Sequence, residues 1–187
     1  MATTQLDRSR LWEVSSRVIV YAAIGAALYG VLGWLINVPI PGSNNVSVRP
    51  AFALVPFFGW AFGPIVGLFT GLVGNALLDQ LSGYGGLTAW NWSIANGLVG
   101  LLAGVFAATP MANALGNRIV GAAVIGVLST IIGLLFVFTD IIVFGNSLQA
   151  ALTGSYGFVV VPDVIAAVIL VPILAAAWEP LKASLGR

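Results

Sequence analysis

Long apolar stretches alternate with short polar segments along the whole chain. A transmembrane helix needs about 20 mainly apolar residues, and the first stretch has that length. The stretch that follows Arg49 is too long for one span, and Gly63-Pro64 divides it into two short helices because proline interrupts a helix. The pattern therefore predicts six membrane-spanning helices, at residues 17–36, 49–62, 63–81, 91–108, 119–144 and 158–178.

These segments predict an all-α integral membrane protein, built as a single bundle of six transmembrane helices. Residues 1–16 are polar and are expected to form a cytoplasmic tail, and residues 1–187 are expected to form one domain. The alternating pattern that is typical of membrane barrel strands is absent from the sequence.

The composition supports a lipid environment. Of the 187 residues, 59% are hydrophobic and 7% are charged, whereas a soluble domain carries roughly 25% charged residues. Mean hydropathy is +1.04. The formal net charge of +1 and the lack of a basic run give no indication of nucleic-acid binding.

The basic residues predict the orientation of the bundle. Six of the seven Lys and Arg residues flank one side, and the positive-inside rule therefore places both termini in the cytoplasm. The loops after the first, third and fifth spans are then external, and they are long and rich in Gly, Asn and aromatic residues, as expected of a protein that captures something outside. The six residues are Arg8, Arg10, Arg17, Arg118, Lys182 and Arg187.

Polar residues near the outer ends of the third and fourth spans indicate a binding site. Asn75 and Asp79 are four residues apart and share one helix face, and the same holds for Trp92 and Asn96. Carboxylates inside a bilayer are costly and usually functional. Aromatic rings beside hydrogen-bonding groups suit a planar heterocycle. The expected cluster consists of Asn75, Asp79, Tyr84, Trp90, Trp92 and Asn96.

Each candidate also has a plainer explanation. The aromatic residues could form an interfacial belt, and Asp79 could simply end a helix in water. Asp140 suits a ligand contact or a structural hydrogen bond. Asp163 follows Pro162, and capping of the last helix is its favoured role. Arg49 could meet a ligand carboxylate or phosphate, or pair with Asp79 or Asp163.

Catalysis finds little support. The sequence contains no Cys and no His, which removes the usual thiolate and imidazole ligands, so neither a metal nor another cofactor is expected. No P-loop is present, and any ATP must therefore be used by other subunits. A membrane enzyme that depends on Asp140 is the least favoured hypothesis.

A stripe of small residues runs along the first span, at Ala22, Ala26, Gly30 and Gly33. Small residues let another helix approach closely. The partner is either a helix of the same bundle or a second protein.

Four segments carry a resemblance to a known family. They are "AAIGAALYGVLGWLINVPIPG", "FGPIVGLFTGLVGNALLDQLSGYGG", "WNWSIANGLVGLLAG" and "DVIAAVILVPIL". Their order and spacing resemble the substrate-binding S components of energy-coupling factor (ECF) transporters, in the riboflavin-transporter-S-like branch. The resemblance runs from about Val20 to Leu174.

The resemblance implies a partner as well as a ligand. S components bind a vitamin at the outer side of the cytoplasmic membrane of bacteria or archaea. They then join an EcfT-type transmembrane coupling protein and two ATPase subunits. An Ala-x-x-x-Ala motif on the first helix faces the coupling protein; it falls here on Ala22 and Ala26, or on the overlapping Ala23 and Ala27, with Gly30 extending the face.

The resemblance also maps ligand contacts onto Asn75, Asp79, Trp92, Asn96 and Asp140. Members that take nickel or cobalt use histidine, so these substrates do not fit. A stacking pocket with carboxylates favours a small heteroaromatic such as a thiamine precursor (hydroxymethylpyrimidine), thiamine or a pyridoxine-like compound. Riboflavin, cobalamin and a stand-alone secondary transporter remain as alternatives.

Overall fold

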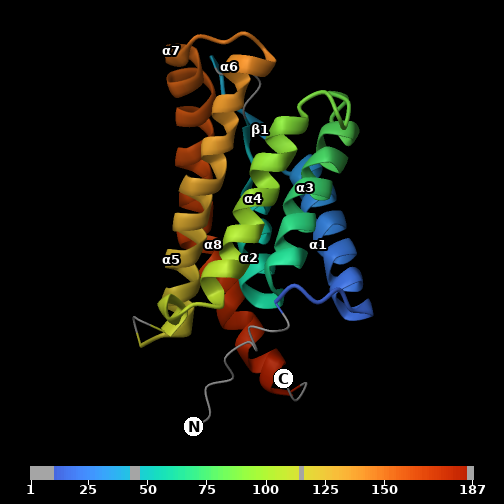
Figure 1. Ribbon diagram of the computed structural model, residues 1–187, viewed down its shortest axis with the longest axis vertical. Helices are drawn as coiled ribbons and strands as arrows, with labels where there is room; N and C mark the ends of the chain where they lie inside the picture. The colour runs from blue at the N-terminus through green and yellow to red at the C-terminus, as the bar shows by residue number, and fades with distance from the viewer. Residues whose placement is uncertain (1–10, 43–46, 114–115, 185–187) are drawn as a thin grey trace.

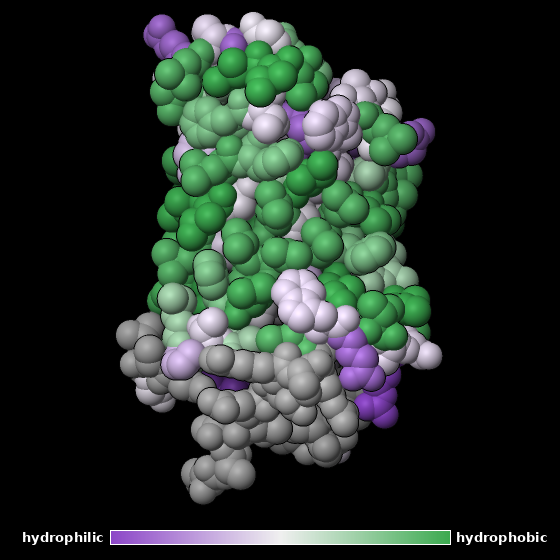
Figure 2. Space-filling model, in the orientation of Figure 1, coloured by the Kyte–Doolittle hydropathy of each residue, from purple (hydrophilic) through white to green (hydrophobic). Residues whose placement is uncertain are grey.

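The chain folds into an elongated bundle of helices that run along its long axis (Figure 1). The computed structural model describes residues 11–42, 47–113 and 116–184. Five helical stretches are long and apolar enough to cross a membrane, and a shorter apolar helix at Pro50–Phe62 adds to them. Hydrophobic side chains cover the middle of the face shown in Figure 2. The predicted helical membrane bundle is therefore confirmed.

The first half of the bundle contains four α-helices, one 3-10 turn and a short β-hairpin. Strands β1 and β2 pair antiparallel between α1 and the 3-10 turn η2. The elements are α1 (Ser16–Leu35), β1 (Val38–Pro39), β2 (Ser47–Val48), η2 (Pro50–Ala53), α2 (Leu54–Phe62), α3 (Pro64–Leu81) and α4 (Trp90–Ala107).

The second half contains two long helical stretches that each change helix type near one end of the bundle. The fifth stretch passes from α-helix to 3-10 helix, and the last begins with a π-helical segment. The elements are η3 (Pro110–Asn113), α5 (Arg118–Gly133), η4 (Leu134–Thr139), α6 (Asp140–Val143), α7 (Leu148–Ala150), η5 (Ala151–Tyr156) and α8 (Gly157–Ser184).

Local sequence explains several helix boundaries. The side chain of Ser15 accepts a hydrogen bond from the backbone N–H of Val18 and caps α1. Gly63 adopts a φ of 104° between α2 and α3, a backbone conformation that residues other than glycine rarely adopt. Pro64 follows at the first position of α3, where its missing N–H is tolerated.

The last helix begins earlier than the sequence analysis expects. Residues 145–157 read as a loop, but the helix starts at Leu148, where the side chain of Ser147 caps it by accepting from the backbone N–H of Ala150. The π-helical segment accommodates the glycine and hydroxyl residues that suggested a loop. Asp163 consequently lies inside α8. The expectation that it caps the start of the last helix is wrong.

The small-residue stripe of α1 packs inside the same chain. Ala22 and Ala26 are only 7% and 6% exposed. A Cβ added at Gly30 would meet the side chain of Leu77 and the backbone oxygen of Gly74, both on α3. The partner helix is therefore α3, and the expectation that Ala22, Ala26 and Gly30 face a second protein is corrected by this packing.

The opposite side of α1 is open. Ala23 and Ala27 are exposed, as are Ile24 and Leu28 beside them. The overlapping form of the Ala-x-x-x-Ala motif thus lies on the exposed face of α1.

One half of the bundle is closed by very tight packing. A Cβ added at Gly100 would overlap the backbone of Gly67, and one at Gly59 would overlap the carbonyl of Gly100. Aromatic rings fill the end of the bundle beyond these glycines: Phe62 lies 4.5 Å from Tyr21 and 4.9 Å from Trp178, centroid to centroid. No room for a passage remains between these backbones.

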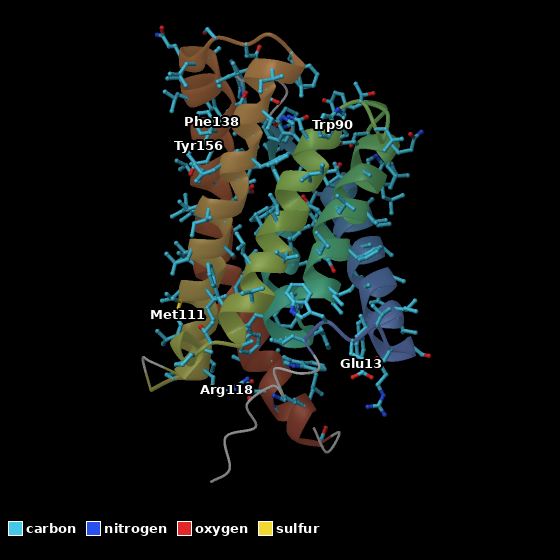
Figure 3. All side chains as sticks on the ribbon, in the orientation of Figure 1. Glu13, Trp90, Met111, Arg118, Phe138 and Tyr156 are labelled. Carbon is cyan, nitrogen blue, oxygen red and sulfur yellow. The ribbon has the colours of Figure 1, made fainter. Side chains whose placement is uncertain are left out.

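Both ends of the described chain lie at one end of the bundle, where α1 starts and α8 ends (Figure 1). Glu13 and Arg118 lie at this end, and Trp90 lies near the other end (Figure 3). Arg118 pairs with Glu179 at 3.1 Å and lies 5.7 Å from the centre of the Trp60 ring. This end is the cytoplasmic one under the positive-inside rule.

Candidate functional site

A cavity of about 480 Å³ lies in the half of the bundle away from the cytoplasmic end. Residues from seven helical elements, from strand β2 and from the loops between them line it, so that segments far apart in the sequence meet here. Its lining consists of Tyr29, Ser47, Arg49, Phe52, Asn75, Asp79, Tyr84, Thr88, Ala89, Trp92, Asn96, Asp140, Phe144, Asn146, Ser155, Val159 and Asp163.

The wall formed by α3 presents Asp79. Its carboxylate Oδ2 accepts a hydrogen bond from Asn75 Nδ2 at 3.0 Å, as the four-residue spacing on one helix face predicts. Asn75 Nδ2 also donates to Ser93 Oγ on α4, at 3.2 Å. Asn75 is therefore occupied in holding Asp79 and in joining α3 to α4.

Tyr29 of α1 connects this wall to α4. Its hydroxyl donates to Asn96 Oδ1 at 3.0 Å and lies 3.5 Å from Asn75 Oδ1. Asn96 in turn donates through Nδ2 to the carbonyl of Trp92, at 2.9 Å. The sequence analysis predicted that Asn75, Asp79, Trp92 and Asn96 converge, and the structure brings them together. The structure also places Tyr29 in this cluster, although the sequence shows it only as an aromatic residue within an apolar span.

Asp140 lies opposite, at the start of α6. Its Oδ1 accepts hydrogen bonds from Asn91 Nδ2 at 2.7 Å and from Trp92 Nε1 at 3.0 Å, and Oδ2 lies 3.2 Å from the same indole nitrogen. Asn91 also donates to Thr139 Oγ1 at 3.0 Å. Asp140 is only 2% exposed. Its carboxylate thus fixes the plane of the Trp92 ring, although it also lines the cavity.

Arg49 and Asp163 complete the charged residues of the cavity. Arg49 precedes η2, and Asp163 lies on α8, on the helix face of Val159. Asp163 is 5% exposed. The guanidinium of Arg49 acts electrostatically on both Asp79 and Asp163. Neither carboxylate has an oxygen within 4.0 Å of a guanidinium nitrogen, so no ion pair forms.

The two remaining aromatic candidates differ. Tyr84 lines the cavity from the loop between α3 and α4 and is about half exposed. Trp90 is also about half exposed, but the structure does not bring it to the cavity. An interfacial position, where tryptophan commonly lies, explains Trp90 better than a ligand contact does.

Sequence reasoning missed several lining residues. Asp163 was visible as an intramembrane carboxylate, which is a functional candidate by itself, but the preceding proline favoured a cap. Ser155 lies on the π-helical segment that the sequence analysis expected to be a loop, and Phe144, the last residue of the predicted fifth span, directly follows α6. Asn91, which donates to Asp140 without lining the cavity, was also missed, because it gave no signal beyond its position next to Trp92.

The arrangement is suited to binding. Its groups are an aromatic face, carboxylates, amides and one guanidinium, which together recognise a small planar ligand. Within the described ranges, no group of three or more His, Cys, Asp or Glu side chains could hold a metal ion.

The sequence matches the family described as "ECF-type riboflavin transporter, S component" over residues 13–178. A solved structure, described as "Structure and mechanism of the S component of a bacterial ECF transporter", has the same fold. It covers 91% of this chain and 98% of its own, with a TM-score of 0.56 and 18% sequence identity.

Curated relatives add little about function. UPF0397 proteins of Streptococcus pneumoniae strains CGSP14 and Hungary19A-6 are 46% and 44% identical to this chain over 88 residues. The matched part is 47% of this chain and 46% of theirs, so the similarity spans about half the length of these relatives.

The family match extends from the residues before α1 almost to the end of α8. It includes all or nearly all of each helical stretch that could cross a membrane among the described residues. The chain belongs to the ECF-type riboflavin transporter S component family and is a multi-pass protein of the cytoplasmic membrane.

Proposed function

We propose that this protein is the high-affinity substrate-binding subunit of an ATP-driven importer, and that it captures a small heteroaromatic compound on the outer side of the membrane. The observation that carries the proposal is the cavity itself. It combines the Trp92 face with Asp79 and Asp163 at the end of the bundle away from the cytoplasm. Half-exposed Tyr84 and Phe144 lie at its rim, where a ligand would enter.

The size and polarity of the cavity guide the choice of substrate. About 480 Å³ is in the lower half of the range for small-molecule sites, roughly 300–1,000 Å³. A single or fused ring fits this volume better than a corrinoid does. Our candidates are hydroxymethylpyrimidine, thiamine and a pyridoxine-like compound, with riboflavin as the alternative and cobalamin as the least suited.

Tight packing below the cavity argues that the protein does not transport alone. The backbones of α2, α3 and α4 meet at Gly59, Gly67 and Gly100, where even a methyl group would overlap a neighbour. Cores packed in this way deform little. A ligand would therefore reach the cytoplasm only if the bundle moved, and a coupling partner driven by ATPases would supply that movement.

We place the contact with that partner, an EcfT-type coupling protein that acts with two ATPases, on the open face of α1. Ala23 and Ala27 are exposed there, and small residues allow another helix to approach closely. Ile24 and Leu28 flank them and are also exposed.

Native mass spectrometry of the purified protein tests the capture function. We expect a co-purifying compound in the mass range of a vitamin, or an increase in melting temperature with one member of a vitamin panel. Failure of both would overturn the proposal. Uptake into vesicles that contain this protein without ATPase subunits would instead identify a stand-alone secondary transporter.

A further inference from the structure

We infer that Arg49 and Asp163 form a recognition subsite for a ring edge on which an N–H donor lies beside an acceptor atom, as in an aminopyrimidine or a lactam. The inference rests on the proposed function and narrows its substrate class. It assigns a role to two charged residues that line the cavity without forming an ion pair with each other.

Asp163 is a buried carboxylate that faces the cavity without a protein donor. It is 5% exposed and lines the cavity, yet no described residue donates a hydrogen bond to it. It lies one helical turn, about 6 Å, deeper than Val159. An unpaired carboxylate at this depth is costly in a membrane protein, and a donor on a ligand would offset the cost.

Arg49 supplies the complementary group. It lines the same cavity, and its Nε is buried without a hydrogen-bond partner among the described residues. It acts electrostatically on Asp163, but the two do not form an ion pair within 4.0 Å. Two opposite charges therefore share the cavity without satisfying each other directly.

Charge decides what can lie between them. A cation at Asp163 would be repelled by the nearby guanidinium, and an anion at Arg49 would be repelled by Asp163 and Asp79. A neutral edge avoids both costs, because its N–H donates to Asp163 while its neighbouring nitrogen or oxygen accepts from Arg49. Hydrogen bonds to charged groups of this kind are stronger than neutral ones.

Three other polar residues that line the cavity already have partners in the protein. Asp140 accepts from Asn91 and Trp92, and Asn96 both accepts from Tyr29 and donates to the Trp92 carbonyl. Asp79 has one oxygen held by Asn75. The ligand edge is thus read mainly by Arg49 and Asp163, while Trp92 provides the stacking face.

Matched ligand pairs test the subsite on the full chain in nanodiscs. The probes are hydroxymethylpyrimidine with its analogue that lacks the 4-amino group, riboflavin with its N3-methyl derivative, and pyridoxine, which has no adjacent donor and acceptor of this kind. Calorimetry should show that one parent compound binds and that its blocked partner binds about 10- to 100-fold more weakly, the range for a lost hydrogen bond to a charged group.

Variants separate the subsite from the rest of the cavity. Asp163→Asn and Arg49→Gln should each weaken binding of the parent about 10-fold or more and should reduce the difference between parent and blocked partner. Arg118→Gln, a matched loss of an arginine at the cytoplasmic end and away from the cavity, should change affinity by less than about 3-fold. The melting temperature of each variant without ligand shows whether a loss of affinity results from a loss of folding.

Three results would overturn the inference. They are equal binding of parent and blocked partner, preferred binding of pyridoxine, and unchanged affinity in both subsite variants. A co-purifying ligand that lacks such an edge would also overturn it and would leave the capture function intact. A protein that retains no ligand and binds no probe would overturn the capture function and the subsite together.

Discussion

The indole nitrogen of Trp92 donates to Asp140 and lies 3.0 Å from Oδ1 and 3.2 Å from Oδ2 of its carboxylate. The two residues are far apart in sequence, on α4 and α6, and Asn91 completes the arrangement from the other side of the carboxylate. A charged residue within a membrane bundle therefore holds an aromatic ring in place at the wall of the cavity. We therefore expect Asp140 to act on a ligand chiefly through Trp92.

We expect Asp140→Asn to weaken ligand binding by about 1–3 kcal/mol, because the amide places a donor against the donors of Trp92 and Asn91. The measurement is calorimetry with the ligand identified by mass spectrometry. In a Trp92→Phe background the same substitution should cost much less, since the ring no longer depends on the carboxylate. Equal costs in the two backgrounds would show that Asp140 contacts the ligand itself. Glu13→Gln, at the cytoplasmic end, is the control for loss of a carboxylate.

Substitutions at Tyr29 and Asp79 should have different effects, the first on the stability of the protein and the second on its affinity for the ligand. Tyr29→Phe removes the donor to Asn96 in a fully buried position, and we expect the free energy of unfolding to fall by about 1 kcal/mol. Asp79→Ala should instead weaken ligand binding by about 1–3 kcal/mol, because a carboxylate that faces the cavity is lost. Melting temperature and calorimetry measure the two effects. The same loss of affinity in both variants would contradict this division.

The sequence was sufficient for the architecture because its main signals are local. Apolar runs, the Gly63-Pro64 break and the asymmetry of basic residues predict the helical bundle and its orientation without knowledge of tertiary contacts. The pairing of Asn75 with Asp79 is also local, since a spacing of four residues places both on one helix face.

The remaining features depend on contacts between distant segments. The stripe at Ala22 and Ala26 has the same sequence pattern whether it meets α3 or another protein, and only the packed bundle distinguishes the two. Asp163 looks like a helix cap as long as the last helix is expected to start near it, but the π-helical segment moves that start to Leu148. The sequence leaves Arg49 either as a ligand contact or as the ion-pair partner of Asp79 or Asp163, and only the fold shows that it lines the cavity without an ion pair to either carboxylate.

Tight glycine packing below the cavity should be sensitive to a single methyl group. Gly100→Ala would force a Cβ against the backbone of Gly67, and we expect a loss of about 1–3 kcal/mol in stability from overpacking. Gly126→Ala is the matched control. Its Cβ would meet side-chain atoms of Val171 at 3.3 Å, which can shift, and alanine favours a helix by roughly 0.5–1 kcal/mol. Equal melting temperatures of the two variants would show that the glycines are not needed for close packing.

The two alanine pairs of α1 should respond in opposite ways to a bulky residue. Ala26→Trp places an indole against α3, where Ala26 is buried, and we expect the protein to lose folded yield and ligand binding together. Ala27→Trp lies on the open face. It should leave the melting temperature and the ligand affinity nearly unchanged, while preventing assembly with the coupling protein and ATPases in a pull-down. Normal assembly of the Ala27→Trp protein would place the coupling surface elsewhere, and normal folding of the Ala26→Trp protein would contradict the packing of α1 on α3.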